Sequence, residues 1–396
     1  MSAKRKDKKG RVLRTGESQR KDLTYQYRYQ DVTGKRITVY APTLEELRAK
    51  EEEINKAARE GINYNAGNVT VIELLERYIS LKQGVRNATK VGYNFVFNLV
   101  KKEDFGHRKI RDIKTSDAKL WLMKLQRDGR GYSTITSVRG VVKPAFQIAY
   151  EEDVLRKNPF DFKLSDVVKN DSQKRVALTK EETDLFMDFI RTDKHYSRYF
   201  DEFVVLLETG MRVSEFCGLT RQQVDFEQKR IWVDHQLVRK PDCSYYVEKT
   251  KTASGCRFIP MTDNVVAAMK NIIAKRPKPA REWLIDGYTG FLLLDKNGNP
   301  KVAMHIEHHF QWAMKKYRRV HPDQPLPKIT PHVFRHTFCT NMAHAGMDLK
   351  SLQYLMGHSD ANVTMNVYTH VAYDHAESSM RKILKLEHRD EARRSG

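Results

Sequence analysis

The chain has 396 residues, and at about 150 residues per domain this length suggests two or three domains. Its 71 lysine and arginine residues outnumber the 50 aspartate and glutamate residues, and the net charge of +21 favours nucleic acid as a partner. No run of about 18 apolar residues is present and the first residues lack an apolar stretch of the signal-peptide type. We therefore expect a cytoplasmic protein without a membrane partner.

A strongly basic segment comes first. Residues 1–21 carry nine basic and two acidic side chains without an apolar period, which predicts a disordered arm. Lys4 and Arg5 in this arm are candidate DNA contacts. The alternative is a tail that only keeps the protein in solution.

Two strands and a helix are predicted next. Residues 23–31 alternate in polarity, residues 36–42 repeat the pattern after a glycine-containing turn, and residues 43–60 have helical periodicity. Arg28 lies on the polar face of the first strand, and a two-stranded ribbon of this kind can enter the major groove of DNA. A solvated strand face is the alternative. We place the end of this small α+β module at residue 66.

Residues 67–165 are predicted to form an all-α domain, because apolar residues recur near a 3.6-residue period. Lys90 and Lys101 are candidate DNA contacts in this domain. The polar stretch at 166–176 follows and is predicted to be a linker.

The remaining residues, 177–396, are predicted to form a mainly α-helical domain with one small antiparallel sheet. Three short strand patterns interrupt the helices at 230–238, 244–251 and 256–261. Close to the C-terminus, an apolar stripe predicts a helical tail that must be buried, and its own domain is the plain place for it; the members of the stripe are Ala376, Met380, Ile383 and Leu384.

The cysteines give no sign of a disulfide framework or of a cysteine zinc site. None of the four forms a CxxC pair, and reduced, mostly buried thiols are the plain interpretation; they are Cys217, Cys243, Cys256 and Cys339.

A first group of candidate site residues follows Gly210, which is expected to end a helix. Arg212 starts the next helix, and Glu215 lies three residues later on the same helical face, where it could hold the guanidinium group. An arginine can bind a phosphate with its planar fork of N–H groups. Lys251 falls between two strand patterns, and a hairpin tip there would extend its side chain away from the sheet. Taken singly, a surface ion pair and a solvated lysine are the commoner outcomes.

A second group lies in the last third of the chain. His332 and Arg335 are neighbours on one face of a predicted helix, and Phe334 and Phe338 on its other face are expected to point into the core. His358 follows a glycine, and Tyr368 comes ten residues later. Each of these residues alone could be an ordinary buried side chain.

A metal site is the weaker interpretation of these residues. His332 and His336 have i, i+4 spacing, but Val333 occupies the position where an HExxH site needs glutamate. No cluster of acidic residues suggests magnesium ions. Arginine, histidine and lysine side chains could instead stabilise the charge on a phosphate during phosphoryl transfer, and a tyrosine could supply the nucleophile. We expect neither a metal nor another cofactor.

The segments "TGMRVSE", "HVFRHTF", "LMGHS" and "VYTHV", in this order, resemble the tyrosine recombinase (lambda-integrase-type) family. Residues 1–60 resemble the arm-binding domain of integrases from conjugative transposons, and residues 68–160 resemble the family's core-binding domain. The resemblance implies a site-specific recombinase that cuts and rejoins double-stranded DNA at core and arm sites. A homotetramer on DNA is the implied assembly, in which the C-terminal tail packs on a neighbouring subunit in preference to its own domain. An accessory DNA-bending or excision factor is a further candidate partner.

The resemblance also implies a role for each candidate. Arg212 and Arg335 bind the scissile phosphate, and His332 and His358 donate hydrogen bonds to it. Lys251 is the general acid for the departing 5′ hydroxyl. Tyr368 attacks and becomes a 3′-phosphotyrosine, while Glu215 supports Arg212.

Two alternatives remain. Residues 347–368 could form a helix-turn-helix of a non-catalytic DNA-binding protein. A type IB topoisomerase would use the same chemistry without strand exchange between two duplexes.

Overall fold

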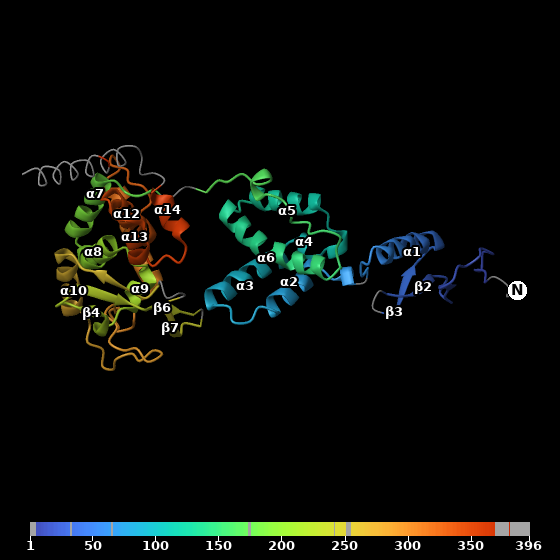
Figure 1. The fold of residues 1–396 in the computed structure, drawn as a ribbon, viewed down its shortest axis with the longest axis horizontal. Coiled ribbons are helices and arrows are strands. Elements are labelled where there is room, and N and C mark those ends of the chain that lie inside the picture. The colour runs from blue at the N-terminus through green and yellow to red at the C-terminus, as the bar shows by residue number, and fades with distance from the viewer. Residues whose placement is uncertain are drawn as a thin grey trace, which may run out of the picture. The chain divides into compact units, whose positions relative to one another are not determined.

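The computed structural model describes residues 5–31, 34–64, 66–172, 176–240, 242–250, 255–368 and 380. The chain divides into two compact units, Met1–Gln173 and Lys174–Gly396 (Figure 1). Lys4, Lys251 and the predicted tail, apart from Met380, lie outside the described residues, and the side chain of Tyr368 is not described either.

The first unit begins with a three-stranded antiparallel sheet in the order β1-β2-β3, next to which one helix packs. The elements are β1 (Glu17–Gln19), β2 (Tyr25–Gln30), β3 (Arg36–Ala41) and α1 (Leu44–Arg59). The predicted strands and helix are present, and Thr43 caps α1 by accepting a hydrogen bond from the Glu46 amide. Tyr25 and Tyr27 are buried in the small core, whereas Arg28, the residue after Tyr27, is exposed.

The prediction of a disordered basic arm is wrong for the described part of residues 1–21. Asp7 is buried and accepts hydrogen bonds from the Tyr25 hydroxyl and from Arg11 Nε, each at 2.9 Å. Glu17 in β1 is fully buried and pairs with Arg48 of α1 at 3.0 Å. A buried carboxylate needs hydrogen-bonding or charged partners, and both acidic residues of this segment find such partners in the small domain. These contacts order the described part of the segment.

The second part of this unit is a helical bundle. Its helices are α2 (Val71–Ser80), α3 (Asn87–Lys101), α4 (Asp104–His107), α5 (Thr115–Arg127) and α6 (Tyr132–Glu151). Phe105 stacks on Trp121 at the centre of its core. Lys90 and Lys101 are both exposed on α3. Val168 is buried in the same core, so the first residues of the predicted linker pack on the bundle.

The second unit is mainly helical and has two small antiparallel sheets among the described residues. Its helices are α7 (Lys180–Thr192), α8 (Phe200–Thr209), α9 (Val213–Gly218), α10 (Asp263–Lys275), α11 (Ala303–Val320), α12 (Pro331–His344), α13 (Leu349–Met356) and α14 (Ala361–Tyr368). Helix α12 packs against α8, and α13 and α14 lie beside it (Figure 1). Phe334 of α12 is fully buried against aromatic rings of neighbouring helices, and Phe338 is buried too.

The expectation of one sheet with a hairpin at Lys251 is wrong. The pattern at 230–238 breaks at Asp234 into two strands, which pair in different sheets. One sheet has the order β4-β5-β8, with β4 (Val224–Asp225), β5 (Arg230–Val233) and β8 (Arg257–Pro260); the other pairs β6 (His235–Arg239) with β7 (Tyr245–Lys249). Strands β7 and β8 are therefore not hairpin partners, and the segment that contains Lys251 connects two sheets.

None of the helices described here combines the length and apolar character that crossing a bilayer requires.

Candidate active site

The site begins at Gly210, whose backbone is in the left-handed conformation. Gly210 ends α8 with φ of +61°, a conformation that a residue with a β-carbon adopts only with strain. The turn brings Arg212 to the N-cap position of the short helix α9. A β-carbon on Gly210 would also lie 2.4 Å from the ring of Phe338, so α8 and α12 approach closely at this point.

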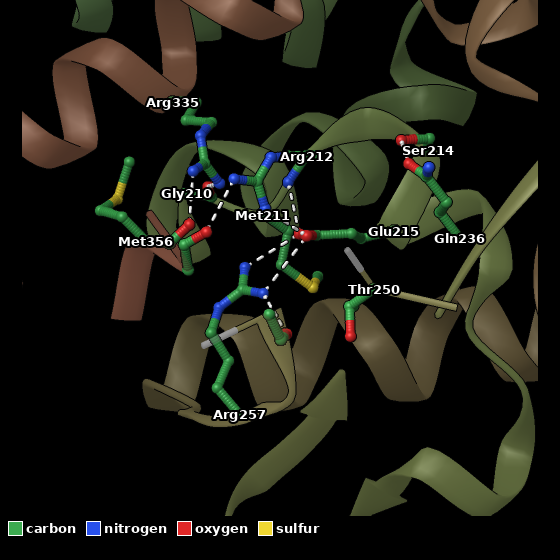
Figure 2. Close-up of polar contacts among 12 residues, drawn as sticks. Gly210, Met211, Arg212, Ser214, Glu215, Gln236, Thr250, Arg257, Arg335 and Met356 are labelled. Carbon is green, nitrogen blue, oxygen red and sulfur yellow. Dashed lines mark hydrogen bonds and ion pairs between the residues drawn. The ribbon is translucent and has the colours of Figure 1, made fainter. Parts of the chain in front are cut away.

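The predicted contact between Arg212 and Glu215 is present. The Arg212 backbone amide donates to Glu215 Oε2 at 2.9 Å, and Arg212 Nη1 donates to Oε1 at 2.6 Å (Figure 2). Arg212 Nη2 donates to the carbonyl oxygen of Gly357 at 2.9 Å. Glu215 is 2% exposed, whereas a third of the Arg212 side chain remains accessible, so the carboxylate holds the guanidinium group from the protein interior.

A second arginine, Arg257 of β8, binds the same carboxylate. Its Nη2 donates to Glu215 Oε2 at 2.9 Å and its Nη1 to Oε1 at 3.2 Å (Figure 2). Although burial by itself raises the pKa of Glu215, the hydrogen bonds and charge of Arg257, together with the charges of Arg212 and Arg335, lower it to about 2. Glu215 is therefore ionised at neutral pH.

Arg335 projects from α12 into the same cluster. Its Nη1 donates to the carbonyl oxygen of Gly210 at 2.8 Å, and its Nη2 donates to that of Met356 (Figure 2). Burial, followed by the charge of Arg212, lowers the pKa of Arg335 to about 9, so the side chain stays charged at pH 7. These carbonyl contacts fix the direction of the Arg335 guanidinium group.

His358 follows the glycine that ends α13. Its Nδ1 lies 2.9 Å from the hydroxyl of Thr364, a buried residue of α14. Burial and the positive charges of Arg335 and Arg212 lower the pKa of His358 to about 4. The ring is therefore neutral at pH 7, so it can accept a proton directly.

For His332 and Tyr368 the structure gives the position in a helix, and Lys251 is not described. His332 is exposed in the first turn of α12, three residues before Arg335. Tyr368 is the last residue of α14, one turn after Thr364. Lys251 lies outside the described residues, between β7 and β8.

The arrangement suits an anion. Arg212, Arg257 and Arg335 surround one carboxylate, and this excess of positive charge is only partly open to solvent. Two guanidinium groups held at fixed angles can bind the non-bridging oxygens of a phosphate. Across the described residues, no group of three or more His, Cys, Asp and Glu side chains is close enough to hold a metal ion.

Sequence reasoning missed Arg257 and Thr364. Arg257 had a detectable signal, because the alternation of β8 places it on the same buried face as Ile259. A charged residue on the apolar face of a strand needs a buried partner. Thr364 had no such signal, because a threonine in a helix is common.

Two family models match the chain. Residues 177–375 match the model described as "Phage integrase family", and residues 1–58 match the "DNA binding domain of tn916 integrase". Two relatives, the "Transposase from transposon Tn916" of Enterococcus faecalis and the "Transposase from transposon Tn1545" of Streptococcus pneumoniae, are each 40% identical over 398 residues. In both cases the match covers 97% of this chain and 98% of the relative.

Solved structures agree with this assignment. The Tn1549 transposon integrase in complex with a circular intermediate DNA is 40% identical and superposes with a TM-score of 0.75, covering 79% of this chain and 99% of that one. A lambda integrase dimer bound to a core site is 15% identical, with a TM-score of 0.54 over 76% of this chain and 95% of that one, and so shares the fold. The chain belongs to the phage integrase family, and it is a site-specific recombinase of the tyrosine recombinase kind.

Proposed function

We propose that the chain integrates and excises a mobile element of the conjugative-transposon kind, using Tyr368 as its nucleophile. The Tyr368 hydroxyl gives its proton to His358 or His332 and attacks the scissile phosphorus, forming a 3′-phosphotyrosine bond. The bond from phosphorus to the 5′ oxygen breaks, and Lys251 supplies the proton that this oxygen takes up. Attack by the 5′ hydroxyl of another strand reverses both steps, so no external energy source is consumed.

The observation that carries this proposal is the cluster of Arg212, Arg335 and His358. The two guanidinium groups are held by carbonyl oxygens and by Glu215, and the neutral His358 ring lies beside them. In our proposal, Arg212 and Arg335 bind the non-bridging oxygens and stabilise their growing charge in the transition state. His358 and His332 donate hydrogen bonds to the same phosphate.

We assign the DNA contacts to separate parts of the chain. Residues 1–66 would bind arm sites through Lys4, Arg5 and Arg28, and residues 67–165 would bind core sites through Lys90 and Lys101. Residues 166–176 would link them to the catalytic domain at 177–396. The relatives support double-stranded DNA as the partner, since the Tn1549 transposon integrase was solved with a circular intermediate DNA and with transposon right end DNA.

The proposed assembly is a homotetramer on two duplexes. Exchange of strands between duplexes needs four active sites, and the apolar stripe of the C-terminal tail would pack on a neighbouring subunit. An accessory DNA-bending or excision factor would select the direction of the reaction.

Tyr368→Phe tests the proposal. The duplex is made from the DNA that flanks the gene of this chain, and it carries a nick that traps the cleaved state. The wild-type protein should form a covalent adduct that peptide mapping places on Tyr368, in the presence of excess EDTA. The variant should bind the same DNA and form none. A variant that still forms adducts would refute the assignment of Tyr368. If the wild-type protein binds the DNA without forming adducts, the alternative of a non-catalytic DNA-binding protein, with α13 and α14 as a helix-turn-helix, would be favoured instead.

A further inference from the structure

Arg257 lies on the buried side of the site, and hydrogen bonds to protein atoms occupy most of its guanidinium group. The side chain is 0% exposed, and four hydrogen bonds are made by the five N–H groups that a guanidinium group carries. Two go to Glu215, and the others go to the carbonyl oxygens of Leu355 at 2.6 Å and of Gly255 at 3.1 Å. Arg257 therefore joins β8 to α9 and to the end of α13.

The contacts of Glu215 are shared evenly between two arginines. Each carboxylate oxygen accepts one hydrogen bond from Arg212 and one from Arg257. A carboxylate has about four such acceptor sites, so Glu215 has no capacity left for Arg212. The remaining N–H groups of Arg212 are thereby directed away from Glu215.

The net charge of the cluster also depends on Arg257. Arg212, Arg257 and Arg335 surround a single carboxylate, which leaves two net positive charges in the cluster. Without Arg257, Glu215 would neutralise Arg212 alone, and one net positive charge would remain to face the phosphate. In a buried site with a low dielectric constant, that difference acts strongly on a developing negative charge.

Arg257 also determines the backbone that carries His358. A β-carbon on Gly357 would lie 2.9 Å from Arg257 Nη1, so the guanidinium group packs directly against this glycine. Gly357 has φ of +61° and ends α13, and its carbonyl oxygen accepts from Arg212. One buried side chain thus contacts both the support of Arg212 and the turn before His358.

We propose that Arg257 is a positioning residue for strand cleavage, which neutralises Glu215 from the protein interior so that Arg212 keeps its charge and its orientation for the scissile phosphate. This inference rests on the proposed function, because it requires that Arg212 bind that phosphate. Arg257 itself is buried and need not touch DNA.

The test compares Arg257→Met with a matched variant, Lys301→Met. Lys301 and Glu202 form another ion pair within the same unit, with side chains 11% and 10% exposed, and neither residue belongs to the site. Both substitutions break a buried ion pair and should destabilise the fold. Adduct formation is measured in single turnover with the full chain, at a temperature well below both melting transitions. Arg257→Met should be slower by about 100-fold or more, whereas Lys301→Met should match the wild-type rate.

A second substrate separates positioning from fold support. A methylphosphonate at the scissile position replaces one non-bridging oxygen with a methyl group and removes the negative charge that Arg212 would bind. The ratio of the rates on phosphate and methylphosphonate should therefore fall by about tenfold or more in Arg257→Met. It should stay unchanged in Lys301→Met. Arg257→Lys restores the charge without the fork and should lie between the two.

Each outcome decides the matter. Arg257→Met cleaving phosphate as fast as Lys301→Met would overturn the inference, and so would equal losses on both substrates. If the wild-type protein forms no adduct at all, the proposed function fails first. Slow cleavage by Arg257→Met beside normal cleavage by Lys301→Met supports the inference even where no variant reacts with methylphosphonate.

Discussion

The α-carbon of Gly210 lies so close to the ring of Phe338 that a β-carbon at this position would come within 2.4 Å of Cδ1. The contact joins the turn before Arg212 to the helix that carries Arg335, and the Gly210 carbonyl oxygen is itself an acceptor for Arg335. The spacing of the two phosphate-binding candidates therefore depends on the absence of one methyl group.

Gly210→Ala should destabilise the protein and slow cleavage. The positive φ alone costs about 1–2 kcal/mol, and the clash with Phe338 adds to it. Gly287→Ala is the matched control, because Gly287 has φ of +89° but no atom of the described residues lies within 4 Å of its β-carbon position. Urea unfolding of both variants should show a clearly larger loss for Gly210→Ala. Equal losses would mean that the contact with Phe338 relaxes at little cost.

The Glu215→Gln substitution should lower the free energy of unfolding, relative to the wild type, by less in acid than at neutral pH. Because the folded-state pKa of Glu215 is about 2 and its ordinary value is 4.5, the ionised form contributes about 3 kcal/mol. A folded pKa below the unfolded one means that this contribution is fully present above about pH 4.5 and is lost as the pH falls towards 2. Urea unfolding of both proteins at pH 7 and pH 3.5 should show the difference between them shrinking by about 1 kcal/mol in acid. A difference that grows in acid would contradict the ion pairs described here.

Thr364→Val should slow cleavage while preserving the fold. The Thr364 hydroxyl contacts His358 Nδ1, and the residue is one helical turn before Tyr368. Valine keeps the shape but removes the hydrogen bond, so the adduct should form roughly five to ten times more slowly. Thr364→Ser retains a hydroxyl and serves as the control. Equal rates for the valine and serine variants, at equal melting temperatures, would show that His358 needs no partner on α14.

Deleting residues 1–60 should remove arm-site binding but preserve cleavage at the core site. The cut leaves two contacts with the helical bundle intact, since the Asn63 amide donates to Asp153 O at 3.0 Å and Arg111 lies over the Tyr64 ring. Core-site affinity should still fall with salt, by about 0.9 log unit per log unit for each phosphate contact. Gel-shift titrations on separate arm and core duplexes measure both effects. Loss of core-site cleavage in the truncated protein would show that the domain division proposed here is wrong.

The sequence by itself determined the family, the helical character of most of the chain and the contact between Arg212 and Glu215. Helical periodicity is local, and an i, i+3 pair at a helix start is fixed by the geometry of one turn. The predicted burial of Phe334 and Phe338 followed from the same periodicity. The motifs around His332, His358 and Tyr368 were readable because each is a short, continuous segment.

Only the tertiary structure decided how these segments meet. Arg257 is far from Glu215 in sequence, and no local pattern states which carboxylate a buried strand arginine will find. The two-sheet arrangement was hidden because the break at Asp234 depends on strand partners contributed by distant segments. The order of the N-terminal segment was missed for a similar reason, since Asp7 is held by Tyr25 of β2. Composition reports the charge of a segment, whereas burial depends on partners that only the folded chain supplies.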